Sequence, residues 1–230
     1  MDIESETQRI RLPISSGNRG YLIAIVAFGI VMAVAYIGTQ SKPKEKIKNA
    51  ILRHDAAAVE AFLQKDARLV NSKDELLKGT PLHWAAIEGD VNSAEVLVNY
   101  GANVNARDSE GMTPLHRAAV LNKPAMIEFL IDYGADINAL VLKYQMANMS
   151  ALHLAAEGGQ YDAVKMLLDY GANLNPQKGD GKDFSPLHMA AGKGRYRVVQ
   201  LLLDRGSDPN LLDSNGNSPI RWAEKNSQEA

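Results

Sequence analysis

The clearest pattern in the chain is a recurring pair of short apolar segments, which begins near residue 46 and runs to the C-terminus. Five related motifs (TPLHWAA, TPLHRAA, SALHLAA, SPLHMAA and SPIRWAE) begin at Thr80, Thr113, Ser150, Ser185 and Ser218. Their starts lie 33, 37, 35 and 33 residues apart. Bulky apolar residues follow each of the first four motifs at helical spacing. The pattern predicts pairs of helices repeated along the chain.

Each motif also carries the signals that begin and end helices. It opens with a threonine or serine, which can cap a helix, and four of the five continue with proline at the first helical position. The paired alanines predict a thin first helix that lets neighbouring repeats approach closely. The residues that lie 21 positions after the first four starts are all glycines, which can end a helix in the left-handed conformation: Gly101, Gly134, Gly171 and Gly206.

These residues resemble the ankyrin repeat family, whose units of about 33 residues contain a turn and two antiparallel helices around a T-P-L-H-x-A signature. The resemblance covers residues 46–230 and implies an all-α solenoid of stacked helix-turn-helix units with short finger turns. We place the start of a worn first repeat at Lys46, with Ile51 and Leu52 in place of the alanine pair. The expected units are 46–79, 80–112, 113–149, 150–184, 185–217 and a half-repeat at 218–230.

The first 45 residues follow a different pattern. Residues 1–20 are polar and charged and predict a disordered tail. Residues 21–38, YLIAIVAFGIVMAVAYIG, carry no charge, and a helix of this length spans about 27 Å, enough for a bilayer core. We predict a single transmembrane helix in the lipid bilayer, followed by a linker at 39–45. A signal peptide cleaved near Ala33–Ala35 is the alternative, and a buried core helix is the third interpretation.

The charges that flank residues 21–38 leave two orientations open. Lysines and arginines are slightly more frequent after this segment than before it, which favours a cytoplasmic C-terminal side. A short tail before a lone span is instead typical of an uncleaved signal anchor that exports the domain behind it. We favour the exported side for the repeat domain, with the cytoplasmic face as the alternative.

Composition excludes several kinds of chemistry. The formal net charge is −2, so no global field attracts nucleic acid or an acidic membrane surface, and the absence of cysteine excludes disulfides and thiolate metal sites. A basic cluster in the fifth repeat lacks interleaved aromatic residues, so nucleic acid is not an expected partner. That cluster comprises Lys193, Arg195, Arg197 and Arg205.

The repeat histidines are better explained as structural residues than as metal ligands. They lie one repeat apart, which rules out the i, i+4 geometry of a helical metal pair, and we expect each to bond backbone groups within its repeat and toward its neighbour. They are His83, His116, His153 and His188. The sequence also has no nucleophile elbow, P-loop or Rossmann glycine pattern. We therefore predict that the protein is not an enzyme and binds no cofactor and no metal.

The family resemblance implies a protein partner, and the repeat register identifies the variable positions. The residue after the repeat histidine is Trp84, Arg117, Leu154 or Met189, and Leu121 lies further along one of these helices. We predict that these side chains form a contact stripe on the concave face. The alternative is that they pack against the fingers of their own domain.

The repeat spacing places the extra residues in the fingers before Ser150 and Ser185. The first of these fingers carries Leu140, Leu142, Tyr144 and Met146, and the second ends at Phe184. Apolar residues in a turn are not needed to close a repeat, so we predict that these fingers contact the partner. The finger before Thr80 is also apolar, with Leu76 and Leu77.

Two functional hypotheses follow. The first is a monomeric, non-catalytic, membrane-anchored module that binds a protein partner through its concave face and apolar fingers. The second is a signal-cleaved, soluble repeat domain that acts as an inhibitor or immunity-type binder of an enzyme. An enzyme with its own nucleophile or base is a distant third, because the sequence offers no cluster of that kind.

Overall fold

The computed structural model describes residues 43–141, 148–175 and 184–227. The chain divides into two units after Gly38, and every described residue belongs to the second unit, Thr39–Ala230. The described residues form eleven α-helices and one 3₁₀ helix and contain no strand. The predicted all-α class is confirmed.

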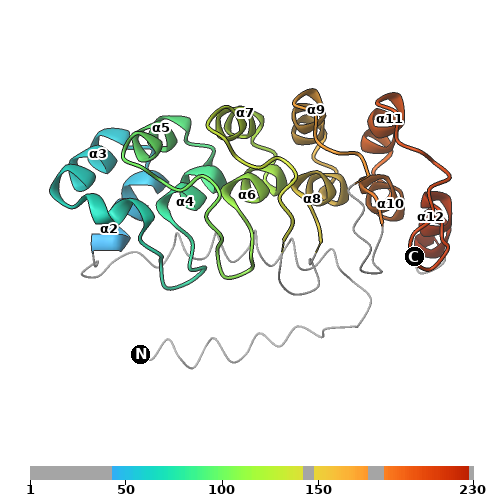
Figure 1. Ribbon diagram of the computed structural model, residues 1–230, viewed down its shortest axis with the longest axis horizontal. Coiled ribbons are helices and arrows are strands. Elements are labelled where there is room, and N and C mark those ends of the chain that lie inside the picture. Colours follow the sequence, from blue (N-terminus) through green and yellow to red (C-terminus); the bar gives the residue numbers. More distant parts are fainter. Residues whose placement is uncertain (1–42, 142–147, 176–183, 228–230) are drawn as a thin grey trace. The chain divides into compact units, whose positions relative to one another are not determined.

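The helices of this unit lie in two layers (Figure 1). The first helices of the repeats form one layer: α2 (Pro43–Leu52), α4 (Pro81–Glu88), α6 (Pro114–Val120), α8 (Ala151–Gly158), α10 (Pro186–Gly192) and α12 (Pro219–Ser227). The second helices form the other: α3 (Ala56–Lys65), α5 (Val91–Asn99), α7 (Pro124–Asp132), α9 (Tyr161–Asp169) and α11 (Tyr196–Asp204). The 3₁₀ helix η2 (Ala67–Asn71) closes the first repeat. Each α-helix packs against the other helix of its repeat or the same helix of the next, which is the predicted stacking of ankyrin repeats.

The second helices end as the glycine pattern predicts. The backbone φ angles of the four glycines lie in the left-handed region, at 86°, 87°, 81° and 91° for Gly101, Gly134, Gly171 and Gly206. In each repeat the next residue donates its N–H back into the helix, as Ala102 does to the Leu97 carbonyl at 2.9 Å. A residue with a Cβ is strained at such a φ angle, which explains why glycine occupies this position in every full repeat after the first.

The core lies between the two layers. The paired alanines of α4, α6 and α8 have no exposed surface, which lets these three helices pack closely side by side. One leucine of each later second helix is also fully buried: Leu97, Leu130, Leu167 and Leu202. Each repeat therefore contributes one thin helix and one bulky helix, and neighbouring repeats cover the apolar faces that a lone repeat would expose.

The first repeat begins earlier than predicted. Helix α2 starts at Pro43, inside the segment assigned to the linker. The Asp55 N–H donates to the Ala50 carbonyl as the Asp90 N–H donates to the Ala85 carbonyl, so Ala50 and Ile51 occupy the alanine positions. The assignment of Ile51 and Leu52 to these positions is therefore wrong by one residue. Helix α3 has ten residues where α5 has nine, and this extra residue brings Asn71 back into the predicted register.

None of the helices within the described ranges is long and apolar enough to cross a bilayer. The predicted tail at 1–20 and the predicted transmembrane segment at 21–38 lie outside those ranges. Both therefore stay predictions from the sequence.

The buried leucines provide a test of the stacking. Leu167→Ala should lower the free energy of unfolding by about 2–5 kcal/mol, because the side chain is fully buried and its removal leaves a cavity between repeats. Leu212→Ala is the matched control, since that leucine is 57% exposed, and it should change stability by less than about 0.5 kcal/mol. Urea unfolding of both variants measures the difference, and equal effects would contradict the proposed core.

Candidate functional site

The candidate site is the set of fingers that join each second helix to the first helix of the next repeat. We number them finger 1 (residues 72–79), finger 2 (106–112), finger 3 (139–149), finger 4 (176–184) and finger 5 (211–217). The structure describes fingers 1, 2 and 5 throughout, both ends of finger 3, and Phe184 of finger 4.

A buried aspartate anchors each of the three fully described fingers. In finger 1 the Asp74 carboxylate accepts the N–H groups of Leu76, Leu77 and Gly79 at 2.7, 2.8 and 2.9 Å. In finger 2 Asp108 accepts the N–H groups of Glu110 and Met112. In finger 5 Asp213 accepts those of Asn215 and Asn217. Each carboxylate thus satisfies the backbone of its turn and fixes the conformation of the finger.

The residue after the repeat histidine position holds the same aspartate from the helix side. Trp84 donates its indole N–H to Asp74 at 3.0 Å, and Trp222 donates to Asp213 at 2.9 Å. In the third repeat Arg117 replaces tryptophan and donates from Nε and Nη2 to one oxygen of Asp108, at 2.8 and 2.5 Å. The sequence analysis missed this pairing, although its signal was available: an aspartate stands nine or ten residues before each of these donors.

The predicted exposed stripe is wrong for four of its five side chains. Trp84, Arg117 and Leu154 are each 1% exposed, and Met189 is 3% exposed. The alternative, in which such side chains pack against their own fingers, holds for Trp84 and Arg117 through the aspartate contacts. Leu121 is partly exposed at the end of α6 and is the one member of the stripe with accessible surface.

The predicted finger residues divide in the same way. Leu140 is buried at the base of finger 3, and Phe184 is half-buried with its ring edge-on to His153 at 5.6 Å between centroids. Leu142, Tyr144 and Met146 lie outside the described residues. Leu140 and Phe184 are therefore part of the packed fold, whereas a partner contact of Leu142, Tyr144 and Met146 stays a prediction.

Finger 3 is held at its base without an aspartate. Val141 donates its N–H to the Met149 carbonyl at 2.9 Å, and Asn148 donates to the Val141 carbonyl at 2.8 Å. The side chains of Val141 and Met149 are 0% and 3% exposed. Leu154 stands at the position from which Trp84, Arg117 and Trp222 donate in their repeats, and an apolar side chain cannot donate. The sequence of finger 3 likewise has no aspartate to accept a hydrogen bond. Finger 3 therefore lacks both the donor and the acceptor of the anchor that fingers 1, 2 and 5 share.

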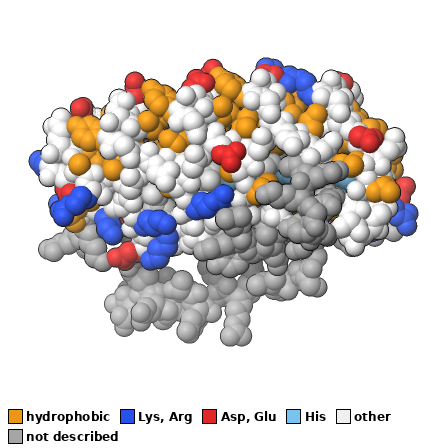
Figure 2. Space-filling view, in the orientation of Figure 1, with side chains coloured by type: hydrophobic (Ala, Val, Ile, Leu, Met, Phe, Trp, Pro, Cys, Tyr) orange, Lys and Arg blue, Asp and Glu red, His pale blue; other side chains and the backbone are white. Residues whose placement is uncertain are grey.

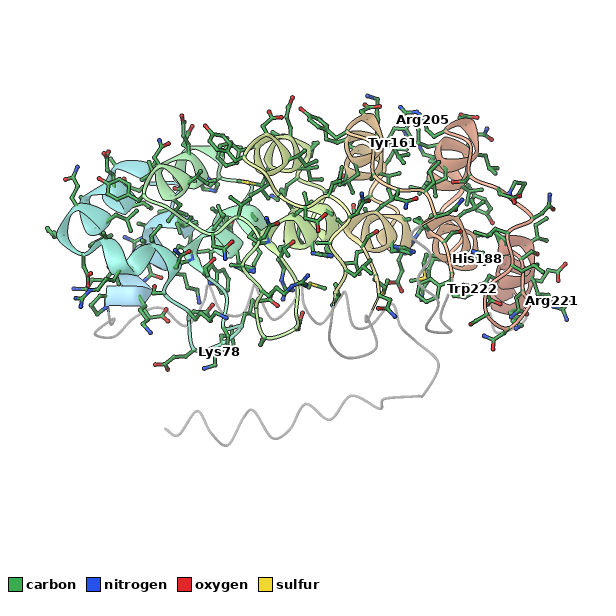
Figure 3. The ribbon with its side chains drawn as sticks, in the orientation of Figure 1. Lys78, Tyr161, His188, Arg205, Arg221 and Trp222 are labelled. Atoms are coloured by element: carbon green, nitrogen blue, oxygen red, sulfur yellow. The ribbon has the colours of Figure 1, made fainter. Side chains whose placement is uncertain are left out.

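Three of the four repeat histidines join the first helix of their repeat to the finger that leads into the next repeat, through the predicted backbone hydrogen bonds. The Thr80 N–H donates to Nδ1 of His83 at 3.1 Å, so Nδ1 is the acceptor and the ring proton is on Nε2. Nε2 then donates to the Met112 carbonyl of finger 2 at 3.1 Å. His153 and His188 make the same two contacts, reaching the carbonyls of Phe184 and Asn217. His188 also lies beside Trp222 (Figure 3).

His116 keeps only the first of these contacts. The Thr113 N–H donates to its Nδ1 at 3.2 Å, while its buried Nε2 has no hydrogen bond of good geometry. The Met149 carbonyl of finger 3 nonetheless lies near enough to raise the pKa of the ring, against the larger effect of burial.

The basic cluster of the fifth repeat is already paired within the fold. Arg205 forms an ion pair with Asp169 at 2.7 Å, Lys193 lies 3.7 Å from the Glu157 carboxylate, and Arg197 stacks over the Tyr161 ring at 4.7 Å. Arg195 donates to the Glu157 carbonyl. These four cations therefore tie α10 and α11 to the preceding repeat, and Figure 3 shows Arg205 and Tyr161 on the layer of second helices.

The anchor of finger 2 yields a prediction. Asp108→Ala should destabilise the protein by about 3–5 kcal/mol, because it leaves the buried Arg117 guanidinium without its main charge partner. Glu110→Ala is the control, since that carboxylate bonds the same arginine at 2.8 Å but is partly exposed, and it should cost less than about 1 kcal/mol. Equal losses in urea unfolding would show that Asp108 does not anchor the finger.

The histidines predict how stability depends on pH. Burial lowers the pKa of His83, His116 and His153 to about 4, so these rings are neutral in the folded protein at neutral pH. In the unfolded chain they titrate near 6.5. The unfolded state therefore binds more protons below this pH, and the stability that is fully present above about 6.5 is lost as pH falls toward 4.

A change from pH 7 to pH 5 should lower the free energy of unfolding by about 1–2 kcal/mol for each fully buried histidine. Urea unfolding across this range measures the loss. His153→Gln removes one titrating ring and should reduce the slope of stability against pH. An unchanged slope in this variant would contradict the assignment.

Comparisons with known proteins agree with this architecture. The family described as ankyrin repeats (3 copies) matches residues 47–141 and again residues 140–213. Among curated proteins, the serine/threonine-protein kinase VIK of Arabidopsis thaliana is 41% identical over 75 residues, which cover 29% of this chain and 17% of the kinase. Because the chain spans under a fifth of that kinase, the kinase's activity stays a property of that protein. The matches, the motifs and the stacked helix pairs together show that this chain belongs to the ankyrin repeat family.

Proposed function

We propose that this protein is a non-catalytic, membrane-anchored ankyrin-repeat module that binds a protein partner through finger 3. Ankyrin repeats as a family suggest binding between proteins, and the repeat positions of this chain are occupied by residues that serve stacking and finger anchoring. Most polar groups of the repeat motif are engaged within the fold, as His83, His153, His188 and the finger aspartates show. We therefore assign partner binding to residues that are needed neither for the stacking of the repeats nor for anchoring the fingers.

One observation carries the choice of finger 3: its closure is complete at the Val141–Met149 pair. These two residues are buried, and backbone hydrogen bonds join the two sides of the finger there. The hydrogen bonds of Val141 with Asn148 and Met149 already close the finger, so closure does not require residues 142–147. Their sequence, LKYQMA, nevertheless contains three large apolar side chains, and apolar residues that the fold does not need are typical of contact surfaces.

The anchored fingers support the same role. Leu76 in finger 1 and Leu212 in finger 5 are 60% and 57% exposed, on turns that buried aspartates hold rigid. A preorganised turn loses little conformational entropy on binding, so an exposed apolar side chain on it is an effective contact. The fingers thus combine fixed bases with accessible apolar residues.

The finger 3 prediction is tested by a triple variant, Leu142→Ser with Tyr144→Ser and Met146→Ser. It should lose capture of the partner from solubilised membranes while the Tm of the protein stays within a few degrees of the original. Tyr196→Ser is the control, because this side chain is 84% exposed on α11, away from the fingers, and capture should persist. A large fall in Tm would place the tip in the core, and unchanged capture would remove finger 3 from the interface.

Alkaline carbonate extraction tests the anchor separately. An inserted helix at 21–38 keeps the protein in the membrane pellet. Release of the repeat domain into the supernatant would instead support the signal-cleaved, soluble inhibitor.

A further inference from the structure

Cations without carboxylate partners gather on the edge formed by α2 and the first two fingers. Lys44, Lys73 and Lys78 are exposed, and Arg107 is half-buried beside them. None of these four forms an ion pair within the described part of the chain, in contrast to Lys193 and Arg205 of the fifth repeat. Figure 2 shows the blue side chains along this edge, below the N-terminal helices.

Hydrogen bonds hold these cations in a row. Lys44 donates to the Lys73 carbonyl at 3.5 Å, Lys73 donates to the Arg107 carbonyl at 3.1 Å, and Arg107 donates to the Leu140 carbonyl at 2.8 Å. Each bond joins one element to the next finger. A carbonyl does not neutralise an ammonium or a guanidinium, so the row keeps its positive charge while its spacing is fixed by the stacking of the fingers.

The carboxylates of this edge are largely engaged by other groups. Asp74 and Asp108 are buried and occupied by the N–H groups of their own turns. Glu110 pairs with Arg117 at 2.8 Å, and Glu45 lies 4.0 Å from Lys48. Lys48 in turn lies over the Trp84 ring at 4.0 Å, beneath the surface. Glu75 is exposed beside Leu76 on finger 1, so the accessible side chains of the edge combine four cations with this carboxylate. The edge keeps an excess of positive charge, although the whole chain carries a formal charge of −2.

An exposed leucine stands among these cations. Leu76 is 60% exposed at the tip of finger 1, between Lys73 and Lys78 in the sequence, and the Asp74 carboxylate accepts its N–H at 2.7 Å. Figure 3 shows Lys78 at the end of this finger, directed away from the helices. A rigid turn with an apolar tip and flanking lysines matches the interface of an anionic bilayer, where apolar groups enter the acyl boundary and lysines meet lipid phosphates.

We propose that this edge, which we name the basic edge (Lys44, Lys73, Leu76, Lys78 and Arg107), binds an anionic lipid surface, with Leu76 entering the interface. The inference rests on the proposed membrane anchor in one respect, the nearness of a bilayer. Lys44 lies six positions after Gly38, the end of the predicted span, a reach of at most about 20 Å in extended chain. The lipid surface is favoured over an acidic protein because a bilayer accommodates both the row of cations and the lone apolar tip.

A fluorescent label at Leu76 tests the proposal directly. The chain contains no cysteine, so Leu76→Cys accepts a single polarity-sensitive fluorophore on the full-length protein. Leu212→Cys is the matched control, because its exposure of 57% is close to the 60% of Leu76 and it lies in finger 5. Both proteins are reconstituted into phosphatidylcholine vesicles with and without phosphatidylserine, and carbonate extraction of the same vesicles reports separately on the anchor.

The proposal predicts a blue shift and an increase in emission at position 76 when phosphatidylserine is present, and neither change at position 212. The triple variant Lys44→Gln, Lys73→Gln and Lys78→Gln should lower the affinity for phosphatidylserine, read from the emission at position 76, about a hundredfold. Each lysine near an anionic leaflet contributes about fivefold to this affinity. The same change at Lys65, Lys165 and Lys225 should leave it intact, and added salt should reduce it.

Three results would overturn the proposal. The label at 76 could stay in water on every vesicle, it could respond equally without phosphatidylserine, or both labels could respond alike. Binding of a polyglutamate peptide at position 76 without any response to vesicles would assign the basic edge to an acidic protein instead. If carbonate releases the protein from the vesicles but the label at position 76 still responds, the proposed anchor is wrong and the lipid-binding edge stands.

Discussion

The structure depends on backbone groups of one repeat that a side chain of the neighbouring repeat satisfies. Asn105 illustrates this, since it donates to the Gly134 carbonyl and accepts the Asp136 N–H, both in the following repeat. Asn71 makes the equivalent two bonds one repeat earlier. His83, in the other layer, reaches a carbonyl of the following finger. Because both layers are joined in this way, the position of each finger is set by its neighbours as well as by its own turn.

This constraint separates the residues that maintain the fold from those that are available for binding. In fingers 1, 2 and 5 an aspartate fixes the turn together with a side-chain donor from the residue after the repeat histidine position. The three turns therefore have a similar form. Finger 3 is fixed instead by the buried pair of Val141 and Met149. Finger 3 thus has a base fixed by apolar side chains in place of an aspartate, and it is the finger for which we propose a role in recognition.

Much of the fold could be predicted because each repeat signal has a local physical cause. Proline and threonine begin helices, glycine ends them, and paired alanines imply close approach, whatever the rest of the chain does. The register of the first repeat was harder, since the one-residue extension of α3 compensates for a shift in α2 and leaves the total length unchanged. The proposed stripe failed for a different reason: Trp84 and Arg117 have donor groups whose acceptors lie nine or ten residues earlier, and apolar patterning does not reveal such pairs.

Hydrogen exchange of the Asp136 amide tests this dependence between repeats most directly. Its N–H bonds to Asn105 of the preceding repeat at 2.9 Å, whereas the adjacent Ala135 N–H bonds to Leu130 within its own repeat, also at 2.9 Å. In the Asn105→Ala variant the account predicts much faster exchange at Asp136 with little change at Ala135. Equal acceleration of both amides, or no change at either, would contradict the claim that neighbouring repeats hold one another through these backbone bonds.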